Sequence, residues 1–223
     1  MSEGPLVSLV VVTHDAFPYV RRLLRSLRRT RGVAYEVVVV DNRSKLLTRA
    51  YLALQAIRGR IQRLCLLERN TWFAQANNIG AAATSRSSRH VVLLNSDTEA
   101  RHPDWLARLL ELHEGGATSY GIVSSGPVPR ADGYCLLVDR ELYLELGLDE
   151  QFEWFWGVTK LQAELLNAGH GVRAVREHDH LLYHFGGKSS GKGLTRGAKG
   201  MRVNRQDVAG WFAGHSVDVI ERA

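Results

Sequence analysis

The stretch LVSLVVV at residues 6–12, followed directly by Thr13-His14-Asp15, decides the fold. Its continuous apolar, β-branched character is typical of a strand buried on both faces. Three further apolar runs occur at residues 36–40, 61–67 and 90–94. Between the runs, apolar residues recur at helical spacing within residues 18–31, 47–57 and 72–84. Strands that alternate with helices in this way predict a mostly parallel sheet covered by helices on both faces.

The pattern changes after Asp97. We expect helices at residues 103–114, 141–146 and 158–168, and strands at residues 134–138, 172–175 and 181–184, whereas glycine and proline dominate residues 115–129. No internal repeat divides the chain. The sequence therefore predicts one α/β domain over residues 1–223, with a first half at 1–98, a smaller second half at 99–190, and a basic glycine-rich loop and C-terminal helix at 185–223.

Composition narrows the class of protein. The 223 residues are 45% hydrophobic and carry a net charge of +6. No apolar run approaches the roughly 20 residues of a membrane span. The two cysteines lie in apolar runs, which indicates buried thiols and a reducing compartment, so we expect a cytoplasmic protein without a membrane span. A nucleic-acid partner would rest on charge alone, and we expect none.

Polar residues gather directly after the predicted strands: Thr13 to Asp15, Asp41-Asn42, Asn70, and Asn95-Ser96-Asp97. In open α/β sheets, ligands bind outside the carboxyl ends of the strands. An acidic residue such as Asp41 is placed there to accept a hydrogen bond from a ribose hydroxyl or a base. The chain contains neither G-x-G-x-x-G after the first strand nor G-x-x-x-x-G-K-[ST], which disfavours NAD(P) enzymes and P-loop NTPases.

Two side chains are candidate metal ligands. Asp97 ends a buried strand with few countercharges nearby, which suits Mg²⁺ or Mn²⁺, although an aspartate in that place also caps helices. His184 ends a predicted strand before a glycine-rich segment, where it could bind the same metal or a phosphate, or simply pack. Lys188, within that segment, could contact phosphates.

Several of these stretches together resemble one known family. They are residues 7–15, 37–44, 70–80, 93–98, 103–106, 147–152 and 168–172. In this order they resemble the family 2 glycosyltransferases of GT-A fold, especially the small bacterial rhamnosyltransferase-like members. The resemblance implies metal-dependent, inverting transfer of a sugar from a UDP, dTDP or GDP donor to a hydroxyl or amine of a glycan, lipid or natural product, with Mn²⁺ or Mg²⁺ as cofactor.

The resemblance also assigns roles by position. The first half, residues 1–98, would bind the nucleotide, and residues 99–190 would face the acceptor. The nucleotide contacts would be Thr13, Asp15, Asp41, Asn70, Asn77, Asn95 and Ser96. Asp97 and His184 would hold the metal at the diphosphate. Lys188, Ser189 and Lys192 would form a lid over that charge.

The chain departs from the family at one position. The family's acidic pair, whose first member is the general base, falls here on Gly157-Val158, and neither residue can take a proton. On a helical reading, Glu153 and Glu164 share a face with Gly157; Glu153 could supply the base, and Glu164 could instead pair with Lys160. The acceptor could also need no base, or the chain could be an impaired homologue that binds nucleotide sugar or a partner transferase.

Beside this gap lie Trp154, Phe155 and Trp156. Trp154 and Trp156 could stack on an acceptor sugar, or the aromatic side chains could be core material. The sequence leaves both readings open.

Overall fold

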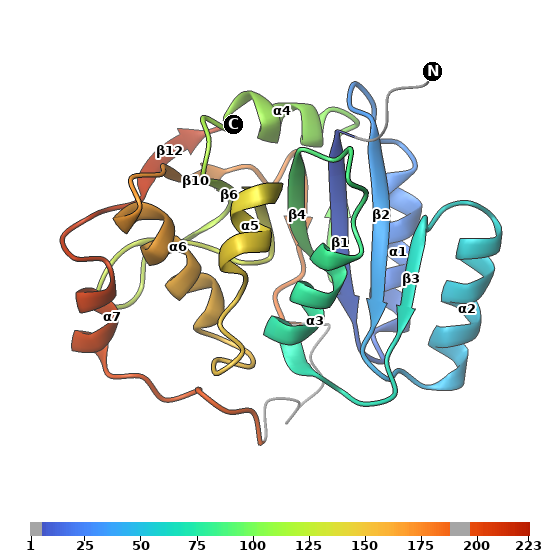
Figure 1. Cartoon of the computed structure of the whole chain (residues 1–223). Coiled ribbons are helices and arrows are strands. Elements are labelled where there is room, and N and C mark those ends of the chain that lie inside the picture. The colour runs from blue at the N-terminus through green and yellow to red at the C-terminus, as the bar shows by residue number, and fades with distance from the viewer. Residues whose placement is uncertain (1–5, 188–196) are drawn as a thin grey trace.

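The computed structural model describes residues 6–187 and 197–223 (Figure 1). Its centre is an eight-stranded sheet in the order β12-β10-β6-β9-β4-β1-β2-β3. The first four strands in the chain, β1 (Val7–Thr13), β2 (Tyr35–Asp41), β3 (Arg63–Leu66) and β4 (His90–Asn95), run parallel. Helices α1 (Phe17–Leu27), α2 (Leu46–Ile57) and α3 (Trp72–Ala82) connect them, as the alternating pattern predicts.

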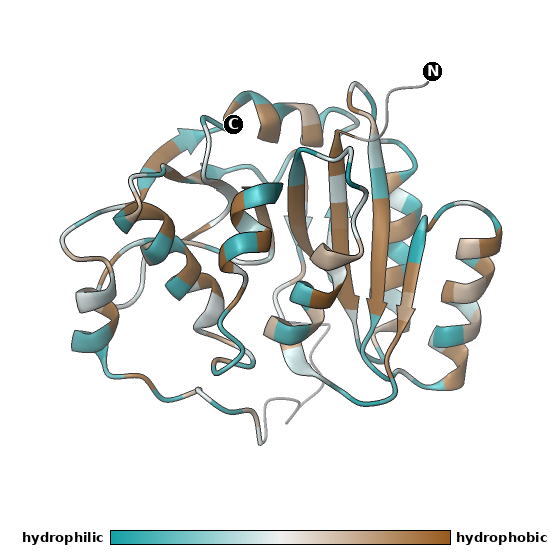
Figure 2. Ribbon diagram, in the orientation of Figure 1, coloured by the Kyte–Doolittle hydropathy of each residue, from teal (hydrophilic) through white to brown (hydrophobic). Residues whose placement is uncertain are grey.

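Strand β1 is buried on both faces because its side chains alternate between two cores. Val7, Leu9 and Val11 pack with α1, whereas Val10 packs with Val38 and α3 on the other face. Figure 2 shows the resulting predominantly hydrophobic colour along the central strands, with mixed colour on the helices. This double burial accounts for the predominantly apolar run at residues 6–12.

The second half extends the sheet with mixed directions. Strand β9 (Cys135–Asp139) pairs antiparallel with both β4 and β6 (Ala117–Tyr120). Strands β10 (Val172–Glu177) and β12 (Asp218–Arg222) then add in parallel to β6. The remaining helices of the described residues are α4 (Trp105–Glu111), α5 (Arg140–Leu146), α6 (Gly157–Asn167) and α7 (Arg205–Trp211).

Two small sheets complete this half. Strands β5 (Thr98–Ala100) and β11 (Leu182–His184) pair antiparallel, and so do β7 (Ile122–Val123) and β8 (Arg130–Ala131). The glycine- and proline-rich residues 115–129, for which no strand was predicted, contain β6, an interior strand of the main sheet. Within the described residues, no helix is both long and apolar enough to cross a membrane.

Candidate active site

A cavity of about 270 Å³ lies at the carboxyl edge of β1, β2 and β4. The chain reaches it from the strand ends, from the start of α3, from the turn before α6 and from β11. Its lining residues are Val12, His14, Asn42, Asn70, Trp72, Phe73, Asn95, Ser96, Trp154, Phe155, His184 and Gly187. The lining combines four aromatic side chains with several amides, the mixture expected where a ligand is held by apolar faces and oriented by a few polar groups.

Asn42 joins the end of β2 to the start of α3. Its Oδ1 accepts a hydrogen bond from the Thr71 amide at 2.7 Å, and its Nδ2 donates to the Trp72 carbonyl at 2.9 Å. The Nδ1 atom of His14 lies 2.6 Å from the Asn42 carbonyl oxygen. Asn42 thereby fixes two walls of the cavity relative to each other. Our site prediction chose Asp41 and missed this neighbour, although its place directly after the strand was the available signal.

The backbone is strained around this cavity. The φ angles are 51° at Asp15, 63° at Arg43 and 62° at Trp72. These values lie in the left-handed region, which residues other than glycine rarely adopt. They are three of the four such non-glycine residues in the described part of the chain. Strain of this kind costs about 1–3 kcal/mol per residue and gathers at sites of function. The three turns therefore mark the same edge of the sheet as the cavity does.

Asp97 and His184 meet because β5 pairs with β11. In that pairing His184 lies opposite Thr98, and the Phe185 amide donates to the Asp97 carbonyl at 2.9 Å. His184 Nε2 consequently lies 3.3 Å from Asp97 Oδ1, although 87 residues separate the two in sequence. The imidazole stacks on the Tyr134 ring with centroids 4.2 Å apart, which fixes its plane.

The pair fits a divalent cation. Adjacent ligands of an octahedral ion with bonds of about 2.1 Å lie about 3.0 Å apart, close to the observed separation. His184 Nε2 is buried and makes no hydrogen bond within the described residues, so it is available as a ligand. Asp97 is fully buried beneath it. One carboxylate and one imidazole would leave most coordination positions to substrate oxygens and water.

Three of the predicted nucleotide contacts lie in the interior. Thr13 is buried, and within the described residues its hydroxyl has no hydrogen-bond partner. Asp41 accepts from the Ser44 amide and pairs with Arg49; burial raises the pKa of Asp41 more than these contacts lower it. Asn77 is buried and donates to the Phe73 carbonyl at 2.8 Å. None of the three belongs to the described cavity lining, whereas Asn70, Asn95 and Ser96 do.

The family can now be identified from the sequence as a whole. A family model described as glycosyl transferase family 2 matches residues 8–159, about two thirds of the chain. The chain belongs to this family. The succinoglycan biosynthesis protein ExoO of Rhizobium meliloti (strain 1021) is 36% identical over 111 residues, which cover 50% of this chain and 30% of that protein.

Solved structures show the fold of this family member. A mannosyltransferase from Pyrobaculum calidifontis, solved with GDP-Man and Mn²⁺, matches with a TM-score of 0.62 at 19% identity, covering 76% of this chain and 54% of that one. TarS of S. aureus, solved with UDP, matches with a TM-score of 0.58 at 18% identity, covering 72% and 55%. The predictions of family 2 and of the GT-A fold are thus confirmed. The chain spans about half the length of these structures and less than a third of ExoO.

The remaining predicted site residues lie around the cavity or outside the described residues. Asp15 Oδ1 accepts a hydrogen bond from the Lys45 amide at 2.6 Å and does not line the cavity. Trp154 lines it, whereas the Trp156 indole donates to the Met201 carbonyl at 3.1 Å. Lys188, Ser189 and Lys192 lie outside the described residues.

The position of the family's acidic pair is the buried start of α6. This helix begins at Gly157, so Glu153 lies in the preceding turn and does not share its face. Glu153 Oε2 accepts a hydrogen bond from the Lys199 amide at 2.6 Å. Lys160 contacts the carboxylate of Asp149. Burial raises the pKa of Glu164 more than the Lys160 charge lowers it.

A second cavity of about 170 Å³ adjoins the first and shares Phe73, Asn95, Trp154 and Phe155 with it. Among the described residues that line either cavity, Asp132 alone carries a carboxylate. Asp132 is half-buried, and its carboxylate makes no hydrogen bond or ion pair within the described part of the chain. We did not predict this residue, because it lies in a segment without a periodic pattern.

Proposed function

We propose that the chain transfers a sugar from a nucleoside diphosphate to a hydroxyl or amine acceptor with inversion at the anomeric carbon. The observation that carries the proposal is the Asp97–His184 pair, 3.3 Å apart, beside an amide-rich and aromatic cavity at the carboxyl edge of the sheet. Membership of glycosyl transferase family 2 supports the same reaction. UDP, dTDP and GDP remain the candidate carriers.

On the donor side, the amides of Asn42 and Asn70 and the rings of Trp72 and Phe73 would hold the nucleotide. Asp97 and His184 would hold Mn²⁺ or Mg²⁺, which when bound supplies countercharge for the departing diphosphate. Because Asn42 hydrogen-bonds both flanks of the Thr71–Trp72 peptide, the nucleotide would enter a preformed wall.

On the acceptor side, Asp132 would replace the missing family base. The acceptor oxygen attacks the anomeric carbon, the bond from that carbon to the phosphate oxygen breaks, and the nucleoside diphosphate departs with the bonding electrons. The acceptor proton passes to the Asp132 carboxylate. Glu153 is the less suited base, because its carboxylate accepts the Lys199 amide and lies outside both described cavities.

The donor proposal is tested by calorimetric titration of UDP, dTDP and GDP with Mn²⁺, Mg²⁺ or EDTA. We expect one nucleotide to bind, to bind more weakly in EDTA, and to lose at least about tenfold in affinity in Asp97→Asn. Failure of all three nucleotides to bind would overturn the proposal. Tight binding with no release of nucleoside diphosphate from any cognate sugar donor would instead favour the impaired homologue.

The base is tested by comparing Asp132→Asn with Glu153→Gln. Loss of a general base typically costs 10²–10⁴-fold in rate. We therefore expect kcat for donor cleavage to fall by about that factor in Asp132→Asn, with unchanged nucleotide affinity, and to change little in Glu153→Gln. The reverse order would assign the base to Glu153 and refute the role of Asp132.

A further inference from the structure

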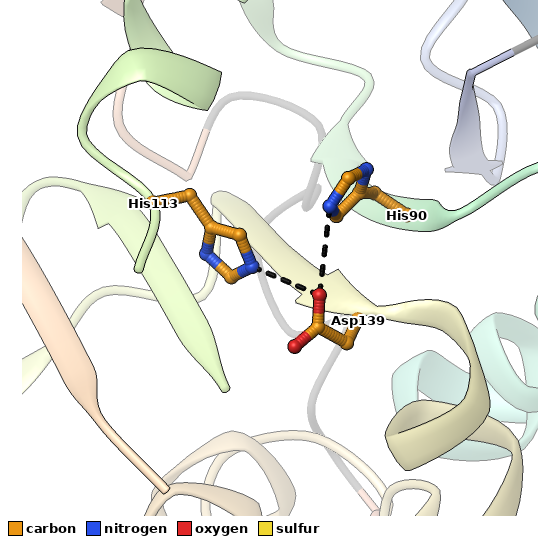
Figure 3. Close-up of side chains that lie close together, drawn as sticks. All are labelled: His90, His113 and Asp139. Carbon is orange, nitrogen blue, oxygen red and sulfur yellow. Dashed lines mark hydrogen bonds and ion pairs between the residues drawn. The ribbon is translucent and has the colours of Figure 1, made fainter. Parts of the chain in front are cut away.

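A cluster of two histidines and one aspartate lies at the other end of the sheet from the cavity (Figure 3). His90 is the first residue of β4, and Asp139, the last residue of β9, is its direct partner in the antiparallel pairing. His113 follows α4 and points toward the same carboxylate. The candidate donor site follows the opposite end of β4, after Asn95, so the cluster is separate from it.

The three side chains converge on one point. The Nε2 atom of His113 lies 3.0 Å from Asp139 Oδ1, and the Nε2 atom of His90 lies 3.5 Å from the same oxygen. The candidate ligand atoms of the three residues all lie within 4.8 Å of one another. In a tetrahedral zinc site with bonds of about 2.0–2.1 Å, neighbouring ligand atoms lie about 3.3–3.4 Å apart. The two distances to Asp139 Oδ1 are therefore close to those between neighbouring corners of such a tetrahedron, and the third separation is within 4.8 Å.

Outer contacts fix two of the three ligands. His113 Nδ1 lies 3.0 Å from Thr118 Oγ1, and Asp139 Oδ2 accepts a hydrogen bond from the Gly116 amide at 2.9 Å. These bonds leave His113 Nε2 and Asp139 Oδ1 facing the shared point. Metal-binding imidazoles and carboxylates are commonly oriented by such partners through their other atoms.

The burial of the cluster suits an ion with one open position. The side chains of His113 and His90 are 5% and 17% exposed, whereas that of Asp139 is 33% exposed. Solvent can therefore reach the cluster from the aspartate side, and water could fill a fourth coordination position. The protein would supply three ligands, a number common in zinc sites that keep a water.

We propose that His90, His113 and Asp139 form a second metal site that binds a transition-metal ion, with Zn²⁺ preferred. Two imidazoles favour zinc and its neighbours, whereas Mg²⁺ and Mn²⁺ favour oxygen ligands. The site thus differs in chemistry from the Asp97–His184 pair and is independent of the proposed transferase activity. It joins β4, β9 and the segment before β6, where the sheet changes from parallel to antiparallel pairing. Bound metal would stabilise this junction, because an ion that binds only the folded chain favours folding.

Co²⁺ is the probe for the test, because its visible absorption reports the number and type of its ligands. The Asp97→Asn variant of residues 1–223 serves as background, so that cobalt at the donor site does not contribute. We expect one Co²⁺ to bind with the spectrum of a four- or five-coordinate site, and an equivalent of Zn²⁺ to displace it. We expect metal-free protein to melt at a higher temperature once Zn²⁺ is added.

His113→Gln should weaken Co²⁺ binding by at least about ten- to a hundredfold and remove the Zn²⁺-dependent rise in melting temperature. His102→Gln is the matched control, since His102 is an exposed histidine 3.8 Å from Asp104. If His113→Gln does not fold, His90→Gln takes its place, because the buried Nδ1 atom of His90 makes no hydrogen bond within the described residues. An Asp97→Asn protein that binds no Co²⁺, or equal binding in the histidine variants and the control, would overturn the proposal and leave a hydrogen-bonded cluster only.

Discussion

Substituting Gly80 by alanine tests how closely α3 must pack on the sheet. A Cβ at this position would lie 2.4 Å from Val10 Cγ1 and 3.0 Å from Val40 Cγ2. Both valines are fully buried on interior strands, so neither can move aside without displacing the sheet. Overpacking of this kind costs about 1–3 kcal/mol, and we expect the upper end. Alanine regains about 1 kcal/mol of helix propensity, which leaves a net loss of about 2 kcal/mol.

The matched control is Gly210→Ala. Gly210 also lies within a helix, α7, but it is exposed and a Cβ there would have no neighbour within 4 Å. The same substitution should therefore stabilise the chain by about 0.5–1 kcal/mol. For a chain of this size, 1 kcal/mol corresponds to a change of about 2–4 °C in Tm. We expect Tm to fall by about 4–8 °C in Gly80→Ala and to rise by about 1–4 °C in Gly210→Ala.

Differential scanning calorimetry of the wild type and the two variants measures these shifts. Gly80→Ala should also weaken nucleotide binding, because displacement of α3 moves Trp72 and Phe73 in the cavity wall. Shifts of the same sign in both variants would refute the reasoning. So would an unchanged Tm in Gly80→Ala, since it would mean that α3 does not contact β1 as closely as described.

Two further substitutions test the cavity wall and the ion pair between Asp149 and Lys160 of α6. Asn42→Ala removes the hydrogen bonds to the Thr71 amide and the Trp72 carbonyl. We therefore expect the free energy of unfolding, measured by urea denaturation, to fall by about 1–3 kcal/mol and nucleotide binding to weaken. Unchanged nucleotide affinity would show that this wall does not contact the donor. Burial is the largest single influence on the pKa of Asp149 and would raise it, but the hydrogen bond from Lys160, the Gln151 amide and the Lys160 charge together outweigh burial, so the pKa is lowered. The pair therefore stabilises the chain above the unfolded pKa of about 3.9, and that stability is lost as the pH falls through the lower folded value. Lys160→Met should lessen this acid-dependent loss in urea titrations at stepped pH, and an unaltered pH profile would contradict the assignment.

The first half of the fold could be predicted closely because its physics is local. A parallel strand buried on both faces is apolar along most of its length, and the run at residues 6–12 corresponds to β1 at Val7–Thr13. The helix signals at residues 47–57 and 72–84 likewise fall on α2 and α3, with small differences at the ends. Each of these segments carries its own periodicity, so no partner strand had to be known.

The strands of the second half are buried by partner strands that no local sequence pattern indicates. Strand β6 has the sequence Ala117-Thr118-Ser119-Tyr120, which is short and polar, yet all four residues are buried. Its burial comes from pairing with β9 and β10, which lie later in the chain. The same holds for β12, whose partner β10 begins about 45 residues earlier. Long-range pairing supplies the burial that the composition of these segments does not indicate.

The residues of the candidate site likewise divide into those that a local pattern predicts and those that depend on long-range pairing. Asn70, Asn95 and Ser96 were chosen because they follow predicted strands, and all three line the cavity. The carboxyl edge of a parallel sheet can be located from the strands alone. Asp132 could not be found in this way, since it reaches the second cavity only through the β7–β8 hairpin and the pairing of β9. The family pattern placed the base at the start of α6, where this chain has Gly157. A cavity wall is built from several segments, and a carboxylate on another of them can occupy the space that the missing one leaves. The loss of a motif residue therefore argues for impaired activity only if no other wall of the cavity carries a carboxylate. In the described lining of the two cavities, Asp132 is that carboxylate.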